Sequence, residues 1–154
     1  MDAMLAFVDS NDFQLVSVVN ELKQLSPEEQ VEGRLYKSFD DNEDTMQYTL
    51  PHFFVMVSLT PEKHAEPSVD AWYKEEHIPM LSRVPSWISS RRFVLLAATD
   101  KAPKYLATHR WGDFAAFTSE EFKQATNTPW RTEVMSQVIE RERLVFKYEG
   151  QVDV

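Results

Sequence analysis

Apolar positions along residues 52–80 change from the pattern of a buried strand to that of a helix. The run 52–59 is almost continuously apolar and rich in β-formers, and Thr60-Pro61 ends it, so we predict a strand buried on both faces. The positions that follow have the spacing of one helical face: Val69, Trp72, Tyr73, Glu76, His77 and Met80. We therefore predict a helix with Ser68 as its N-cap and Pro79 limiting its end.

The second part of the chain predicts two paired strands, an interrupted helix and a last strand. Residues 87–96 and 104–111 have strand composition and flank a turn at 100–103, which predicts a hairpin. A helix is expected from residue 119, with an interruption at 126–129 and a continuation over 130–140. With a strand at 141–149 the order is βαββαβ, which predicts the α+β fold class: a ferredoxin-like sandwich whose antiparallel sheet carries both helices on one face.

The first fifty residues resemble the second half of that unit. Leu5-Ala6 and Asp12-Phe13 have the spacing of Leu106-Ala107 and Asp113-Phe114, and residues 34–37 echo residues 143–147. With helical spacing over 13–25, these matches predict a βαβ half repeat in residues 1–50 ahead of a complete unit in residues 51–154; chance similarity is the alternative. A half sheet must pack on the complete unit or on a second chain, so we expect a homodimer.

Composition excludes several classes of function. The 25 acidic and 16 basic residues give a formal charge of −9, which repels phosphate backbones and anionic lipid, so we expect neither nucleic acid nor a membrane as partner. The chain has no cysteine, which excludes disulfides and thiolate metal sites. We find no run of the length of a membrane span, and we expect a soluble, cytoplasmic protein.

Candidate chemistry centres on two histidines. His77 follows Tyr73 by four residues, so the two share a helical face, with Trp72 beside them. An imidazole titrates near neutrality and can move a proton, while a phenol can hold an enolate oxygen. The alternative is that His77 donates to a backbone carbonyl and caps the helix near Pro79. His109 is a second acid/base candidate, or else a satisfied polar residue among aromatics.

The predicted third strand supplies further candidates for contact with a substrate. Tyr105, Ala107, His109 and Trp111 alternate in phase and share one face, either the helix-covered face or a barrel lumen. Arg91 and Arg92 project to opposite faces of their strand, so one of them can present a guanidinium to an acidic substrate. The predicted substrate-binding residues are Trp72, Trp87, Arg92, Tyr105 and Trp111.

Other charged residues carry weaker signals. Glu75 and Glu76 point in different directions on a helix and are interpreted as a charged face. His52 and His64 have no third ligand at a recognisable metal spacing, so no metal is expected. The sequence contains neither a glycine-rich phosphate loop nor a nucleophile elbow, and no cofactor is predicted.

Four motifs resemble those of a known family: residues 70–79, 84–87, 91–93 and 125–131. Together they are similar to the EthD-like branch of the dimeric α/β-barrel superfamily, and in particular to fungal proteins with two ferredoxin-like repeats. The resemblance covers 52–149 well and 5–40 as a partial first repeat. It implies a fold more specifically than a reaction, since relatives include cofactor-free oxygenases, polyketide cyclases, decarboxylases, dehydratases and isomerases.

Two classes of function follow. The first is a cofactor-independent lyase or cyclase that decarboxylates, cyclises or dehydrates a small aromatic or polyketide-like substrate, with His77, Tyr73 and His109 as catalytic residues; a cofactor-free monooxygenase is a variant of this hypothesis. The second is a non-catalytic barrel that binds a ligand or acts as a scaffold. The cavity discriminates between them, because bulky aromatic side chains that fill it would leave no room for a substrate.

Overall fold

The computed structural model describes residues 20, 23–24, 32–39 and 53–148 of the chain. The strands in this part are β1 (Arg34–Ser38), β2 (Phe53–Pro61), β3 (Trp87–Ala98), β4 (Tyr105–Trp111) and β5 (Val138–Lys147). The helices are η1 (Lys63–Ala65), α2 (Glu66–Trp72), the π-helical turn η2 (Tyr73–His77), α3 (Ile78–Leu81), η3 (Phe114–Thr118), α4 (Glu120–Ala125) and α5 (Pro129–Ser136).

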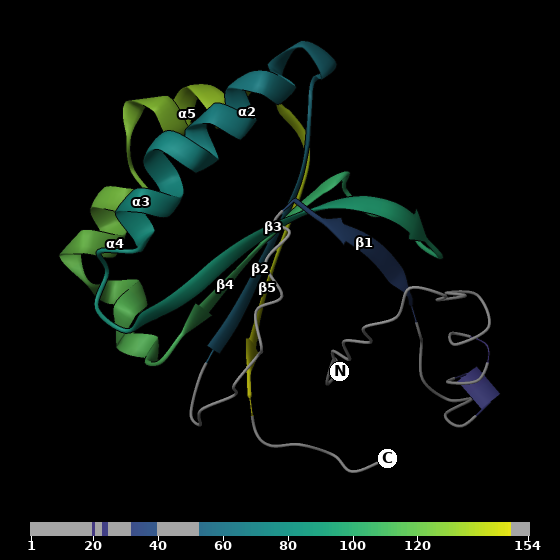
Figure 1. Ribbon diagram of the computed structural model, residues 1–154, viewed down its shortest axis with the longest axis horizontal. Coiled ribbons are helices and arrows are strands. Elements are labelled where there is room, and N and C mark those ends of the chain that lie inside the picture. The colour runs from purple at the N-terminus through teal and green to yellow at the C-terminus, as the bar shows by residue number, and fades with distance from the viewer. Residues whose placement is uncertain (1–19, 21–22, 25–31, 40–52, 149–154) are drawn as a thin grey trace.

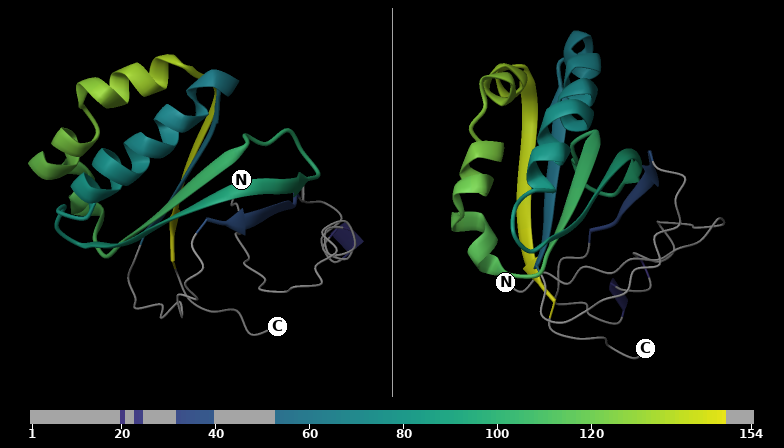
Figure 2. Two further views of the ribbon diagram at one scale, coloured as in Figure 1. Left: turned by 45° about the horizontal axis from the view of Figure 1, so that its top comes forward. Right: turned by 60° about the vertical axis from the view of Figure 1, so that its left-hand side comes forward.

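The five strands form one antiparallel sheet in the order β1-β3-β4-β2-β5. Without β1, the remaining strands have the order expected when the two halves of a βαββαβ unit interleave, with β4 between β2 and β3 and β5 outside β2. The helices α2, α3, α4 and α5 lie on one side of the sheet (Figures 1 and 2). The structure therefore confirms the predicted α+β, ferredoxin-like fold and the predicted hairpin of β3 and β4.

The first helical region differs from the prediction at both ends. It begins at Glu66 with Pro67 in its first turn, where a missing N–H costs no hydrogen bond, so Ser68 is not the N-cap. Pro79 does not end the helix but lies in the first turn of α3. The wide turn η2 precedes it, with the N–H of Ile78 donating to the carbonyl of Tyr73, and such a turn relieves the crowding that a proline ring causes in an α-helix.

The last strand begins earlier than predicted. α5 ends at Ser136 and β5 starts at Val138, which pairs with Pro61 of β2, so the prediction of a helix up to residue 140 was wrong. The pairing of β5 with β2 extends over the whole of β2. Residues 138–140 thus form a strand despite their helical spacing, because pairing with β2 stabilises the strand and this pairing depends on the tertiary structure.

β1 attaches the N-terminal part of the chain to the complete unit. It pairs with β3. The strand predicted at residues 34–37 was expected to pack on the complete unit or on a second chain, and it packs on the complete unit. Asn20, Lys23 and Gln24 are helical; the rest of the helix predicted over 13–25, and the strand predicted near residue 5, lie outside the described residues. The division into a half repeat and a complete unit therefore remains a prediction.

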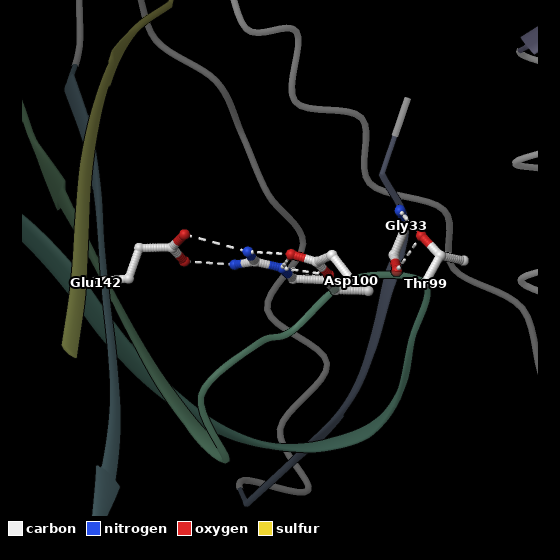
Figure 3. A network of polar contacts seen from close by, with 5 residues as sticks. Gly33, Thr99, Asp100 and Glu142 are labelled. Carbon is white, nitrogen blue, oxygen red and sulfur yellow. Dashed lines mark hydrogen bonds and ion pairs between the residues drawn. The ribbon is translucent and has the colours of Figure 1, made fainter. Parts of the chain in front are cut away.

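The sheet is strongly curved on the side away from the helices. Arg34 of β1 donates to Asp100 in the β3–β4 turn and also to Glu142 of β5 (Figure 3). In a flat sheet β1 and β5 would lie about 19 Å apart, at roughly 4.8 Å per strand, so the two edges must approach one another. Under this bridge lies an apolar cluster: Phe54, Met56 and Leu106, with Tyr36, Phe93 and Phe146 against it.

Candidate functional site

A cavity lies between the helical layer and the sheet. Its volume is about 80 Å³. The lining comes from β2, β4, β5 and most of the helices, and consists of Val55, Val57, Trp72, Tyr73, His77, Leu81, His109, Trp111, Phe117, Phe122, Thr126, Arg131, Met135, Arg141 and Arg143. The three predicted catalytic residues therefore line one cavity, on the helix-covered face of the sheet.

His77 is held from two sides. The indole of Trp72 stacks on its ring, with centroids 4.3 Å apart and an interplanar angle of 20°. Its Nδ1 lies 3.2 Å from the carbonyl oxygen of Ala125 at the end of α4. A carbonyl can only accept, so Nδ1 carries the hydrogen and Nε2 keeps its lone pair in the neutral ring. His77 therefore does donate to a backbone carbonyl, but to one on a different helix rather than at its own helix end.

Burial controls the protonation of His77. It lowers the pKa to about 4, with a further decrease from the charge of Arg131, while the hydrogen bond to Ala125 acts in the opposite direction. The residue is 8% exposed, and removing an imidazolium from water is costly. His77 is thus neutral at neutral pH and is available as a base.

His109 faces His77 from the sheet. The two rings meet edge to face, with centroids 6.1 Å apart. Burial lowers the pKa of His109 to about 3; the positive charge that His77 carries when it is protonated, and the charge of Arg143, lower it further. Both histidines are consequently uncharged in the folded protein over the whole neutral range.

A short chain of hydrogen bonds connects Trp87 and Ser90 to His109. The indole Nε1 of Trp87 donates to the hydroxyl oxygen of Ser90 over 3.0 Å, and that oxygen lies 2.7 Å from Nδ1 of His109. With Trp87 as its donor, the hydroxyl has its own hydrogen to give to Nδ1. We assign the ring hydrogen of His109 to Nε2, the tautomer in which Ser90 both accepts from Trp87 and donates its own hydrogen. His77 then offers an acceptor at Nε2, and His109 offers a donor.

Tyr73 completes the polar part of the cavity. Its ring lies edge-on to His77, with centroids 5.5 Å apart, which agrees with the predicted shared helical face. The guanidinium carbon of Arg92 lies 4.8 Å from the ring centroid. Burial raises the pKa of Tyr73 to about 12, so the phenol stays protonated and can act as a hydrogen-bond donor but not as a base.

Glu76 has a positioning role that the charged-face interpretation missed. Its Oε1 accepts from the indole Nε1 of Trp72 over 3.1 Å and from the hydroxyl of Thr128. Glu76 thereby fixes the indole that stacks on His77 and ties it to the N-terminus of α5. The spacing of four residues between Trp72 and Glu76 could have indicated this contact, because residues i and i+4 are neighbours on a helix. Glu75 is exposed, as predicted.

Three predicted substrate-binding residues do not line the cavity. Nη1 of Arg92 donates to Asp70 over 2.7 Å, the hydroxyl of Tyr105 donates to Glu66 over 2.8 Å, and Trp87 acts through Ser90. Trp72 and Trp111 do line the cavity, and both are 1% exposed. Contact with a substrate remains a prediction for all five residues.

Three arginines at the cavity were not identified from the sequence. Arg131 comes from α5, and Arg141 and Arg143 come from β5. The spacing of the last two places them on one strand face, but no sequence pattern indicated that α5 would bring Arg131 to the same place.

The described residues contain no group of three side chains suited to a metal ion. His64 is exposed and pairs only with Glu62, and His52 lies outside the described ranges. No helix in the described part is long and apolar enough to cross a membrane.

No protein family profile matches the chain, and no curated protein is significantly similar to it. Solved structures with a similar arrangement include a cofactor-independent oxygenase from Streptomyces nogalater, at 18% identity and a TM-score of 0.44, over 66% of this chain and 96% of the other. Rv0793 from Mycobacterium tuberculosis matches at 11% identity and a TM-score of 0.49, over 66% and 99%.

An EthD family protein from Bacillus halodurans, the family that the sequence motifs resemble, matches at 11% identity and a TM-score of 0.39, over 65% and 100%. At such identities the likeness concerns the arrangement of strands and helices alone. The fold assignment therefore rests on the strand order and register of the chain itself.

Proposed function

We propose that the protein is a cofactor-independent enzyme that transfers protons on a small aromatic or polyketide-like substrate. The observation that supports this most directly is the pair of buried histidines that line one cavity; with the assigned tautomers they present complementary ring nitrogens. A base and a hydrogen-bond donor at the same small volume are what enolate chemistry requires.

The roles follow from the assigned tautomers. Nε2 of His77 accepts a proton from a carbon next to a carbonyl, and the N–H of His109 and the hydroxyl of Tyr73 stabilise the oxyanion that forms. The return of the proton from His77 completes the exchange. Decarboxylation, aldol cyclisation and dehydration all pass through such an enolate, so the same three residues serve each of them.

Burial of His77 has two opposite effects on the proton transfer. A pKa of about 4 keeps His77 in its base form at neutral pH but makes it a weak base. The negative charge that develops on the substrate lies beside the developing imidazolium and offsets the cost of burying it. Proton transfer is therefore favoured only when a substrate is bound.

The size of the cavity favours the second candidate, a non-catalytic binding protein. About 80 Å³ is smaller than a cavity of about 150 Å³ that accommodates benzene, and Trp72 and Trp111 occupy much of the surrounding space. An aromatic substrate therefore requires side-chain movement at the cavity. A chain that only binds a smaller ligand, or serves as a scaffold, requires none.

Benzoylacetate is a suitable first substrate, because it is small and aromatic and forms an enolate. We expect the protein to accelerate both exchange of its C2 hydrogens in D₂O and release of CO₂, and we expect His77→Gln to abolish the acceleration. His64→Gln, which alters an exposed histidine, should retain it. Equal rates for the wild type and His77→Gln would refute the proposal, and oxygen uptake without CO₂ release would identify the monooxygenase variant.

A further inference from the structure

Three arginines line the cavity that the two histidines also line. Arg143 and Arg141 pair in register with Val57 and Leu59 of β2, so their side chains project to the helix-covered face of the sheet. Arg131 is half-buried on α5, while Arg141 and Arg143 are exposed and also line the cavity. The three arginines therefore lie where the cavity opens to solvent.

The three arginines are unpaired within the described residues. No side-chain hydrogen bond or ion pair in that part of the chain involves their guanidinium groups, whereas those of Arg34 and Arg92 pair with carboxylates. The contrast is informative because the chain has 25 acidic residues. Burial lowers the pKa of Arg131, and the like charge of Arg141 lowers it further.

A second polar group at the cavity also lacks a partner. The indole Nε1 of Trp111 is buried, and nothing in the described part of the chain accepts its hydrogen. Trp111 lines the same cavity as the arginines. A buried donor without an acceptor is destabilising, and a second ligand oxygen, separate from a carboxylate at the arginines, would satisfy it.

We propose that Arg131, Arg141 and Arg143 bind the carboxylate of a small aromatic acid whose body enters the cavity. Guanidinium groups bind carboxylates through paired, charge-assisted hydrogen bonds. The aromatic part then lies beside Trp111 and His77, after the side-chain movement that a cavity of about 80 Å³ requires. This inference deepens the proposed function, because it names the charge and the class of the substrate of the same site.

Anion binding also affects the catalytic pair. Positive charge from Arg131 disfavours the imidazolium of His77, and that from Arg143 disfavours the imidazolium of His109. A bound carboxylate neutralises part of this charge and makes both rings more basic. The carboxylate subsite and the base are thus coupled by charge.

Benzoate and its neutral analogue benzamide provide the test. We expect saturable benzoate binding by calorimetry, weakened about tenfold by Arg143→Gln or Arg141→Gln and partly restored by Arg143→Lys. Benzamide binding should be unaffected by these variants. The control is Arg83→Gln, which removes the same charge from an exposed position that does not line the cavity, and unfolding temperatures verify that each variant folds.

Four results would overturn the inference. The first two are the absence of saturable benzoate binding up to about 10 mM and equal binding of benzoate and benzamide. The third is a loss of benzoate affinity in Arg83→Gln as large as that in the cavity variants. The fourth is displacement of benzoate by inorganic phosphate at equal concentration, which would indicate a general anion site. None of these measurements depends on turnover. If His77→Gln abolishes benzoylacetate turnover but the arginine variants bind benzoate as the wild type does, this inference alone is refuted. If the arginine variants weaken benzoate binding but His77→Gln turns over benzoylacetate as the wild type does, the proposed function alone is refuted.

Discussion

The imidazole rings of His77 and His109 meet edge to face with their centroids 6.1 Å apart, one supplied by the helical layer and one by the sheet. Neither ring has a carboxylate partner in the described residues. The pair is therefore held by burial, by aromatic stacking and by neutral hydrogen bonds. This arrangement has consequences for stability, for the tautomers and for the residues that support the rings.

Stability should fall as the pH drops from 7 to 5. The pKa values of His77 and His109 are about 4 and about 3 in the folded protein, below the ordinary value of 6.5, so the unfolded state binds more protons in this range. The stability that the neutral rings contribute is fully present above pH 6.5 and is lost below it, on the order of 2 kcal/mol per histidine by pH 5.

Urea denaturation at pH 7, 6 and 5 measures this effect. His77→Gln should remove about half of the decrease, and His64→Gln should leave it unchanged. The carboxylates with lowered pKa values lose their contribution mainly at lower pH, as the pH falls through their own range. An unchanged decrease in His77→Gln would contradict the assignment of the buried neutral ring.

The tautomers of the two histidines should be opposite. Long-range ¹H–¹⁵N correlation spectra at pH 7 should show the hydrogen of His77 on Nδ1 and that of His109 on Nε2. Ser90→Ala removes the donor to His109 and should produce a mixture of tautomers there while His77 stays unchanged. A hydrogen on Nδ1 of His109 in the wild type would show that Ser90 accepts rather than donates.

Glu76 should matter more for stability than its neighbour on the same turn. Glu76→Ala leaves the buried indole Nε1 of Trp72 without an acceptor, and we expect a loss of about 1–3 kcal/mol in the free energy of unfolding. Glu75→Ala removes the same side chain from an exposed position and should cost less than about 0.5 kcal/mol. Equal effects of the two substitutions in urea denaturation would refute the positioning role.

Sequence patterns predicted the elements of the fold because the period of a strand or helix is a local property. The apolar run of β2 and the hairpin of β3 and β4 needed no knowledge of the tertiary structure. The start of β5 was misplaced because pairing of Val138 with Pro61 decides it. The spacing of four residues between Tyr73 and His77 likewise predicted that the two side chains lie at one site.

The rest of the site depends on features that have no local signature. The π-helical turn η2 brings the ring of Trp72 onto that of His77, five residues later, whereas these two positions are about 140° apart around a regular α-helix. The meeting of Arg131 with the arginines of β5 depends on how α5 packs over the sheet. The hydrogen bonds from Trp87 through Ser90 to His109 depend on the register of β3 against β4, which places Ser90 opposite His109.

The bridge from Arg34 to Asp100 and Glu142 should hold β1 onto the curved sheet. The side chains of Arg34 and Asp100 are 16% and 14% exposed, and the two carboxylates raise the pKa of Arg34, so its charge persists at all accessible pH values. Arg34→Met leaves both carboxylates unpaired and should cost about 1–3 kcal/mol in the free energy of unfolding.

The exposed pair Lys123–Glu120 provides the comparison. Lys123→Met should cost less than about 1 kcal/mol, because water screens that pair. Hydrogen exchange should also locate the effect of Arg34→Met: the amides of β1 should lose protection first, while those of β2 and β4 at the centre of the sheet keep theirs. Equal protection of β1 in the wild type and in Arg34→Met would show that backbone pairing with β3 alone holds this strand.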